Sequence, residues 1–174
     1  QTEESIMTNV NSAVNTSAVA KALGLSDATR QSSVDILTTS LAATYTLYTK
    51  TRKFHWNVTG MYFQQLHALF EAQYTQLEEA VDELAERVVM LGSPAIGTLE
   101  EMQEHSYIQE TPGVNPDADG MVAELLADHE SVIRHLRVDI DAVTENGDAG
   151  TADFLTGLLE QHEKTAWFLR AHLE

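Results

Sequence analysis

The chain has 174 residues, of which 43% are hydrophobic, and this is enough for one domain with its own core. It contains no cysteine, so disulfides, iron–sulfur clusters and thiolate zinc sites are excluded, and any metal ion must bind to nitrogen and oxygen. Its 27 acidic and 10 basic side chains give a formal net charge of −17, and such a surface repels nucleic acids and anionic membranes.

The acidic surface has a simple explanation, because hydrated carboxylates suit a salty cytoplasm in which screening limits their mutual repulsion. We therefore expect a protein from a halophile. The sequence has no run of about 18 apolar residues without a charge, and its start lacks the features of a signal peptide. We expect a cytoplasmic location and no membrane contact.

The first 30 residues are rich in Ser, Thr, Asn and Ala and show little apolar periodicity. They are predicted to be a flexible tail, residues 1–30, with one turn near residues 18–23. A single bundle domain is predicted for residues 31–174. Its first helix is expected from about residue 28 to residue 57, because apolar residues recur there every three or four positions and Gly60 follows.

The second helix is expected at 61–91, and a long polar connection follows it. The segment GTLEEMQEH, at 97–105, predicts a short helix in this connection. The third helix is expected from an N-cap at Asp117 to residue 145, and the fourth at 151–173. No segment has the period of two that marks a strand. The pattern predicts an all-α, ferritin-like four-helix bundle with a short extra helix in the long middle connection.

The second helix carries an apolar stripe with a polar stripe beside it. The apolar stripe consists of Phe70, Leu77, Val81, Leu84, Val88 and Leu91. The polar stripe consists of His67, Glu71, Glu78, Asp82 and Glu86. A solvated helix face explains such a stripe most simply. However, imidazole and carboxylate are ligands that borderline and hard metals prefer, and like charges four residues apart destabilise a helix unless a cation lies between them.

Glu71 and Asp82 cannot bind the same ion within one chain, because eleven residues of helix separate them by about 16 Å. Two copies of the helix that cross antiparallel about a two-fold axis would bring them together, since facing residue numbers then have a constant sum. His67 with Glu86 and Glu71 with Asp82 satisfy this condition. No Glu-x-x-His motif of an intrachain di-iron site is present. We therefore predict a metal site shared between two chains.

The segment from residue 53 to residue 92 resembles the Dps family, also called mini-ferritins. The resemblance rests on the order and spacing of the family's ferroxidase residues, which match His55 in FHWNVTG, His67, Glu71, and Asp82 and Glu86 in DELAER. Many members have Asp at the position of Glu71. Weaker similarity in MVAELLADHESVIRHLR and QHEKTAWFLRAHL extends the resemblance over nearly everything after the tail.

This resemblance implies a hollow homododecamer with tetrahedral symmetry and ferroxidase sites between two-fold-related subunits. In the family, the equivalents of His55, His67 and Glu71 come from one chain, and those of Asp82 and Glu86 come from the other. The expected function is oxidation of Fe(II), usually by hydrogen peroxide and more slowly by dioxygen, with storage of Fe(III) mineral inside the shell. Iron is the expected metal, and pairing of the electrons limits hydroxyl-radical formation.

Several further acidic residues have two open interpretations. Glu78, Glu79 and Glu83 are expected either to face the cavity and nucleate mineral or to be solvated surface acids. The resemblance places three-fold pores near the start of the last helix, where Asp148 and Asp153 are candidate pore residues. Helix N-capping is the alternative for either aspartate.

The remaining aromatic and histidine residues have simpler expected roles. Trp56 is expected to be a core aromatic residue or, by the resemblance, an indole close to the iron that is oxidised sacrificially. Surface or packing roles are expected for the other histidines, which are His105, His129, His135, His162 and His172.

Binding to DNA is not expected, although several Dps proteins bind it through a lysine-rich tail. The tail here contains Glu3 and Glu4 and no basic residue before Lys21, so it supplies no early contacts to phosphates. The alternative function is a non-catalytic acidic shell or a DNA-associated protective protein. A larger maxi-ferritin cage is a second alternative, which the missing Glu-x-x-His motif disfavours.

Overall fold

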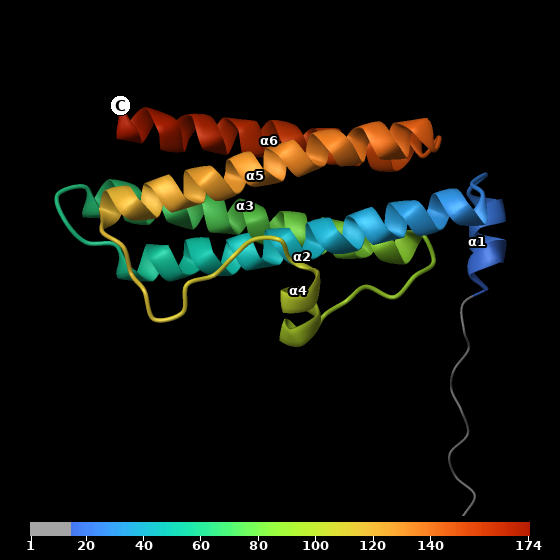
Figure 1. The fold of residues 1–174 in the computed structure, drawn as a ribbon, viewed down its shortest axis with the longest axis horizontal. Helices are drawn as coiled ribbons and strands as arrows, with labels where there is room; N and C mark the ends of the chain where they lie inside the picture. Colours follow the sequence, from blue (N-terminus) through green and yellow to red (C-terminus); the bar gives the residue numbers. More distant parts are fainter. Residues whose placement is uncertain (1–14) are drawn as a thin grey trace, which may run out of the picture.

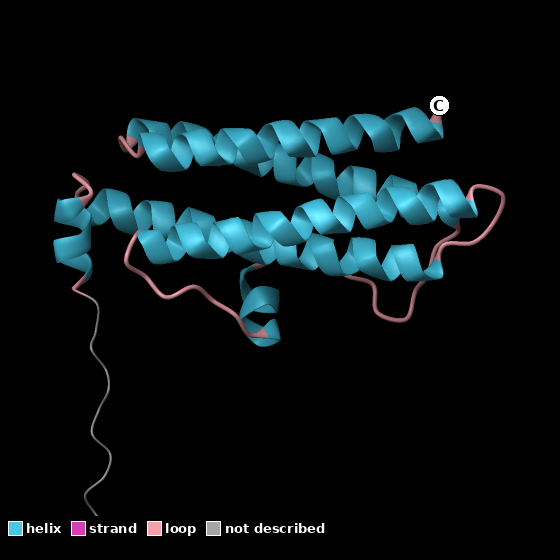
Figure 2. Ribbon diagram, turned by 180° about the vertical axis from the view of Figure 1, so that it is seen from behind, coloured by secondary structure: helices cyan, strands magenta, loops and turns pink. Residues whose placement is uncertain are grey.

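Six helices make up the part of the chain that the computed structural model describes, residues 15–174. The four long helices are α2 (Asp27–Asn57), α3 (Phe63–Met90), α5 (Ala118–Glu145) and α6 (Ala149–Leu173), and the short ones are α1 (Thr16–Ala22) and α4 (Leu99–His105). The α2–α3 pair lies beneath the α5–α6 pair (Figure 1). Figure 2 shows helices and loops and no strand in these described residues, which confirms the all-α prediction.

Local capping interactions explain where several helices begin and end. The Asp117 carboxylate accepts a hydrogen bond from the Gly120 amide at 2.9 Å, so the predicted N-cap of α5 is confirmed. Thr98 and Glu101 form a reciprocal capping box that starts α4, the short helix predicted in the middle connection. The chain turns back after α2 through Gly60, whose φ of +106° favours glycine.

Residues 15–30, which were predicted to belong to a flexible tail, are mostly helical. The α1 helix buries Ala20, and Val19 lies so close to Gly92 that a Cβ there would meet it at 3.0 Å. Arg30 is buried and donates from Nη1 to the Leu91 carbonyl at 3.2 Å. Residues 15–30 therefore pack against the bundle, on the tail side of the predicted boundary at residue 30. Residues 1–14 of the predicted tail lie outside the described residues.

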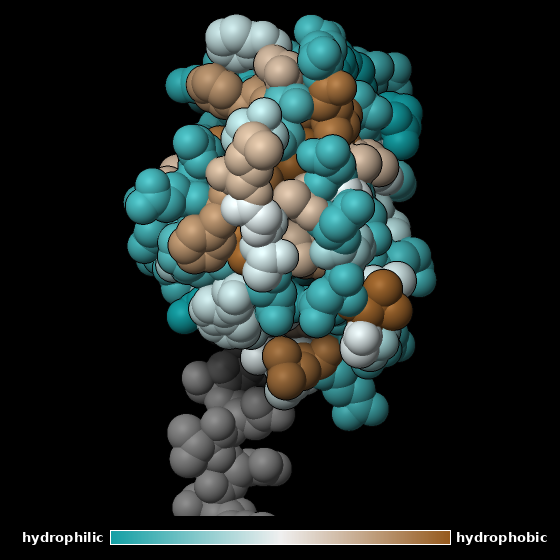
Figure 3. Space-filling view, turned by 90° about the vertical axis from the view of Figure 1, so that its left-hand side faces the viewer, coloured by the Kyte–Doolittle hydropathy of each residue, from teal (hydrophilic) through white to brown (hydrophobic). Residues whose placement is uncertain are grey.

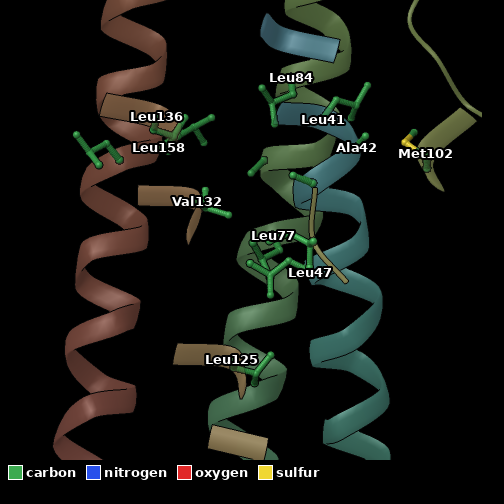
Figure 4. Packing of buried hydrophobic residues seen from close by; sticks show 14 of the residues in the cluster. Leu41, Ala42, Leu47, Leu77, Leu84, Met102, Leu125, Val132, Leu136 and Leu158 are labelled. Carbon is green, nitrogen blue, oxygen red and sulfur yellow. The ribbon is translucent and has the colours of Figure 1, made fainter. Parts of the chain in front are cut away.

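The core lies along the interior of the bundle, where side chains of all four long helices meet. Figure 4 shows Leu41 and Leu47 of α2, Leu77 and Leu84 of α3, Leu125, Val132 and Leu136 of α5, and Leu158 of α6. The predicted apolar stripe of α3 is confirmed, since all of its members are buried except Val81, which is half-buried against the core. This packing leaves the polar stripe on an open side of α3.

Two ion pairs tie the helix pairs together. Lys50 of α2 contacts Asp128 of α5 at 2.6 Å, and Arg87 of α3 contacts Asp148 at the start of α6 at 3.2 Å. The end of the molecule that carries the α2–α3 turn mixes apolar and polar side chains on its surface (Figure 3). No helix within residues 15–174 is long and apolar enough to span a membrane.

Candidate metal centre

The α2–α3 turn brings His55 and His67 face to face. His55 lies in the last turn of α2 and His67 in the second turn of α3, and their ring centroids are 3.7 Å apart with an interplanar angle of 21°. His55 is buried, with 8% of its surface exposed, whereas His67 is half-buried. The two imidazoles therefore form one stacked pair at the edge of the bundle.

Backbone carbonyls fix which nitrogen of each ring carries the proton. His55 Nδ1 lies 2.8 Å from the His67 carbonyl oxygen, and His67 Nδ1 lies 2.8 Å from the His55 carbonyl oxygen. Because a carbonyl oxygen only accepts, both Nδ1 atoms must donate. Each Nε2 of a neutral ring then carries a free lone pair, and this is the arrangement in which metal-ligating histidines are usually held.

Aromatic rings hold this pair in place. Tyr74 of α3 packs edge-on against His55, with centroids 5.2 Å apart, and Phe63 lies 5.1 Å from His67. Tyr74 follows His67 by seven residues and so shares its face of α3. Tyr74 was not among the residues predicted for the site, although this spacing is visible in the sequence.

The carboxylates of the polar stripe do not join the histidines within one chain. Glu71, Asp82 and Glu86 are all exposed on α3. Within residues 15–174, no group of three or more His, Cys, Asp or Glu side chains is placed to hold a metal ion. One chain therefore presents the imidazole pair near one end of α3 and the Asp82–Glu86 pair towards the other end.

A broad hollow of about 640 Å³ lies beside the carboxylate half of α3. Glu78, Glu79 and Asp82 line it together with Tyr45 and Tyr48 of α2, and α4 closes its far side with Met102. The Tyr48 hydroxyl lies 3.4 Å from Glu78 Oε1. Three acidic side chains thus face a space that is large enough to admit another protein segment.

Comparison with known proteins places this architecture in a family. The ferritin-like domain family model matches residues 34–174. A protein named DNA protection during starvation protein 2, from Bacillus anthracis, is 36% identical over 140 residues, which is 80% of this chain and 95% of the relative. The chain belongs to the Dps family of ferritin-like proteins. The ferritin-like part of the fold prediction is thereby confirmed.

The chain is also similar to a further relative and to solved Dps structures, and the latter agree with this assignment. A low temperature-induced protein from Nostoc is 46% identical over 153 residues, covering 87% of this chain and 86% of that protein. DpsC from Streptomyces coelicolor superposes with a TM-score of 0.85 at 32% identity, over 87% of this chain and 89% of that one. A Dps homologue from the archaeon Halobacterium salinarum superposes with a TM-score of 0.84 at 31% identity, over 88% of this chain and 85% of that one.

Asp148, a candidate pore residue by resemblance to Dps proteins, is instead the N-cap of α6. Its carboxylate accepts from Ser33 Oγ at 2.7 Å, from the Thr151 amide at 3.0 Å and from Thr151 Oγ1 at 2.6 Å, beside Arg87. Burial raises the pKa of Asp148, but these hydrogen bonds and Arg87 outweigh it and hold the pKa below its ordinary value. Only 3% of the residue is exposed, which contradicts a pore-lining role.

Asp153 and Glu83 are exposed in this Dps chain, so the pore role predicted for Asp153 and the nucleation role predicted for Glu83 stay open.

Trp56 is 65% exposed, so its predicted role as a core aromatic residue is wrong for the single chain. The Arg52 guanidinium lies 5.4 Å from the Trp56 ring centroid and makes a cation–π contact with the exposed indole.

The packing role expected for two of the remaining histidines is confirmed, since His129 and His162 are buried together in the bundle core. His105 and His135 are exposed, as expected for surface residues, and His172 is half-buried beside Tyr62.

Proposed function

We propose that this Dps chain is a ferroxidase and iron-storage subunit. It oxidises Fe(II), preferably with hydrogen peroxide, and deposits Fe(III) mineral inside a homododecamer with tetrahedral symmetry. The observation that carries the proposal is the pair of reciprocal hydrogen bonds that leaves both Nε2 atoms of His55 and His67 free to bind a metal. A solved Dps structure from Vibrio cholerae is 30% identical over 87% of this chain and 95% of that one, with a TM-score of 0.83. It is described as a member of a superfamily of ferritin-like diiron-carboxylate proteins, and this supports iron as the metal.

The site is completed by a second chain. His55, His67 and Glu71 of one subunit face Asp82 and Glu86 of its two-fold partner, so that each dimer has two sites. This arrangement supplies the carboxylates that a single chain keeps too far from the histidines. It also explains why an acidic stripe is retained on α3, because a bound cation relieves the repulsion between carboxylates four residues apart.

Two bound Fe(II) ions supply one electron each to a single peroxide, whose oxygen–oxygen bond breaks. With two further water molecules the products are two iron oxyhydroxide units and four protons, so atoms and charge balance. Because both electrons leave together, no hydroxyl radical is released. Imidazole must be neutral to bind, so iron loading is expected to weaken on acidification.

Mineral growth and iron entry involve acidic groups outside this site. Glu78, Glu79 and Glu83 are proposed to gather hydrolysed Fe(III) on the cavity side, and Asp153 is the remaining pore candidate.

The net charge of −17 supports a role in the cytoplasm of a halophile. The same charge argues against direct binding to DNA, and a salt-dependent gel shift with the purified protein would contradict that expectation.

Ferroxidase activity is tested by adding Fe(II) anaerobically, then hydrogen peroxide, and following Fe(III) absorbance. Wild-type protein is expected to oxidise about two irons per peroxide rapidly, whereas Asp82→Ala/Glu86→Ala is expected to be slow. The matched control is Asp141→Ala/Glu145→Ala, which removes an exposed Asp and Glu with the same spacing from α5. Equal rates in all three proteins would favour the non-catalytic acidic shell.

The size of the shell separates the Dps assembly from a larger ferritin cage. A dodecamer of 19.2 kDa chains has a mass of about 230 kDa, half that of a cage with twenty-four subunits. Light scattering on the purified protein measures this mass directly. A mass near the larger value would contradict the dodecamer.

A further inference from the structure

A second histidine pair lies inside the bundle, apart from the α2–α3 turn. His129 of α5 and His162 of α6 are 2% and 4% exposed, and their Nδ1 atoms are 2.8 Å apart. Only one of two neutral imidazoles can donate in such a contact, so at least one Nδ1 presents its lone pair to the other ring. Two nitrogen ligands therefore converge in the core.

The polar groups around this pair are incompletely satisfied. His129 Nε2 and both amide atoms of Gln73, which is 6% exposed, are buried without a hydrogen-bond partner in the described residues. Buried polar atoms rarely remain in that condition without a ligand, a water or an ion. Gln73 lies two residues from Glu71, and at about 100° per residue it therefore points to the opposite side of α3.

A cavity of about 10 Å³ joins these groups. Gln73, His129 and His162 line it, with Thr165 and Gln161 of α6 beside them. This volume is close to what one water molecule or one ion requires. Polar side chains of α3, α5 and α6 thus meet around one small cavity within one chain, with Leu77 and Ala80 also lining its wall.

The separation of the two Nδ1 atoms suits a bound cation. Two nitrogens that bind one metal ion at about 2.1 Å with an angle near 90° lie about 3.0 Å apart, whereas a tetrahedral angle sets them about 3.4 Å apart. The observed 2.8 Å is nearer the first value. The Nδ1 positions therefore need to move little, but both rings must turn so that their lone pairs point at a common ion rather than along the line between the two nitrogens.

We propose that His129 and His162, with the side-chain oxygen of Gln73, form an intrachain site for a divalent first-row transition metal. All three ligands are neutral, so the site favours nitrogen-preferring ions such as Co²⁺ and Ni²⁺ over Mg²⁺ and Ca²⁺. A bound ion links α3 of one helix pair to α5 and α6 of the other and stabilises the bundle.

The protonation state of the pair supports metal binding. Burial lowers the pKa of His162 to about 4, and burial together with the neighbouring imidazole lowers the pKa of His129 well below its ordinary value. Both rings are neutral at neutral pH, so a metal ion does not compete with a second proton on either ring. This site does not depend on the proposed ferroxidase function, because none of its three residues belongs to the shared centre.

The test uses the assembled, metal-stripped His67→Gln/Asp82→Ala/Glu86→Ala protein as the parent, so that neither the imidazole half nor the carboxylate half of the shared centre takes up the probe. Co²⁺ is titrated, its visible d–d absorption is followed, and bound metal is counted after desalting. One Co²⁺ per chain with nitrogen ligation is expected, together with a higher Tm in the presence of Co²⁺. An unchanged Tm and no Co²⁺ uptake at this stoichiometry would overturn the proposal.

Variants then assign the ligands. His162→Gln in the parent is expected to lose this Co²⁺. The control His135→Gln, which changes an exposed histidine whose Nδ1 donates to the Ser131 carbonyl, is expected to keep it. Gln73→Leu retains both imidazoles and fills the same volume, so it tests the site even if His162→Gln fails to fold. It is expected to weaken Co²⁺ binding at least about 10-fold. Co²⁺ binding as in the parent, in either His162→Gln or Gln73→Leu, would overturn the proposal.

Discussion

The tautomers of His55 and His67 are set by backbone carbonyls rather than by other side chains. The resemblance to the Dps family, in which the equivalents of His55 and His67 come from one chain, implied that both rings belong to one site. It did not show the reciprocal hydrogen bonds, because these depend on how the turn through Gly60 folds α3 back onto α2. Residue types, spacing and the family resemblance therefore predicted the candidate ligands, and tertiary structure supplied their tautomers.

Replacing His67 by glutamine removes one imidazole from the pair. His67→Gln is expected to slow peroxide-driven Fe(II) oxidation at least about 10-fold, because loss of a direct ligand exceeds the effect of losing an outer-shell partner. The initial rate of Fe(III) absorbance measures this. His135→Gln is the matched control, since the His135 Nδ1 also donates to a backbone carbonyl, at 2.9 Å, but on an exposed face of α5. An unchanged rate in His67→Gln would place the metal elsewhere.

Asp148 shows why sequence alone did not separate capping from pore lining. Its acceptor atoms are engaged by Ser33, which is 115 residues away in the chain, and by Arg87 on α3. No local pattern reveals such partners. Burial of the carboxylate therefore became evident only in the folded structure, whereas Asp153, five residues later, stays exposed.

Asp148→Asn is expected to destabilise the bundle by about 2 kcal/mol at neutral pH, because it weakens a helix cap and several charge-assisted hydrogen bonds. The pKa of Asp148 is lowered in the folded state, so its stabilisation is present above the ordinary carboxyl pKa and is lost as pH falls through the lowered value. The difference in Tm between wild type and variant should therefore shrink with acidification. Asp153→Asn, the exposed control, should show no such pH-dependent difference.

At the level of helices, apolar periodicity made the four long helices predictable, whereas only one turn, near residues 18–23, was expected where α1 lies. Ala20 is the buried residue of α1, so this helix has no apolar stripe for a pattern to reveal. Its stability comes instead from the Asn15 cap, which accepts from the Ala18 amide at 3.1 Å, and from contact with the α3 C-terminus. Contacts of this kind are set by tertiary packing.

Gly92→Ala is expected to loosen the docking of α1. Gly92 has a φ of +79°, and a Cβ there would lie 3.0 Å from the Val19 side chain. Gly113→Ala is the matched control, because Gly113 has a φ of +78° and a Cβ there would have no atom within 4 Å, so this substitution incurs only the backbone strain. We expect Gly92→Ala to lower the free energy of unfolding by about 1–2 kcal/mol more than Gly113→Ala in urea titrations. Equal losses would mean that the contact between Val19 and residue 92 does not limit stability.

Over the whole molecule, acidic side chains exceed basic ones by 17, so most surface carboxylates have no cation to pair with. The Lys50–Asp128 pair uses a basic group inside the bundle, whereas Arg137–Glu163 and Arg170–Glu130 pair on the surface. The folded chain therefore carries a net self-repulsion, which assembly into a shell would concentrate further. Bound cations, whether iron at the shared centre or salt in solution, are expected to offset it.

Salt is expected to stabilise the protein through this screening. Raising NaCl from 0.1 M to 1 M shortens the Debye length from about 10 Å to about 3 Å, so repulsion between neighbouring carboxylates weakens. We expect Tm to rise by about 3–6 °C, which corresponds to roughly 1–2 kcal/mol for a chain of this size. The comparison variant is Asp141→Asn/Glu145→Gln/Glu160→Gln, which neutralises three exposed carboxylates. The Tm of this variant should exceed that of wild type at 0.1 M NaCl and match it at 1 M NaCl. A wild-type Tm that is independent of salt would show that charge repulsion does not limit stability.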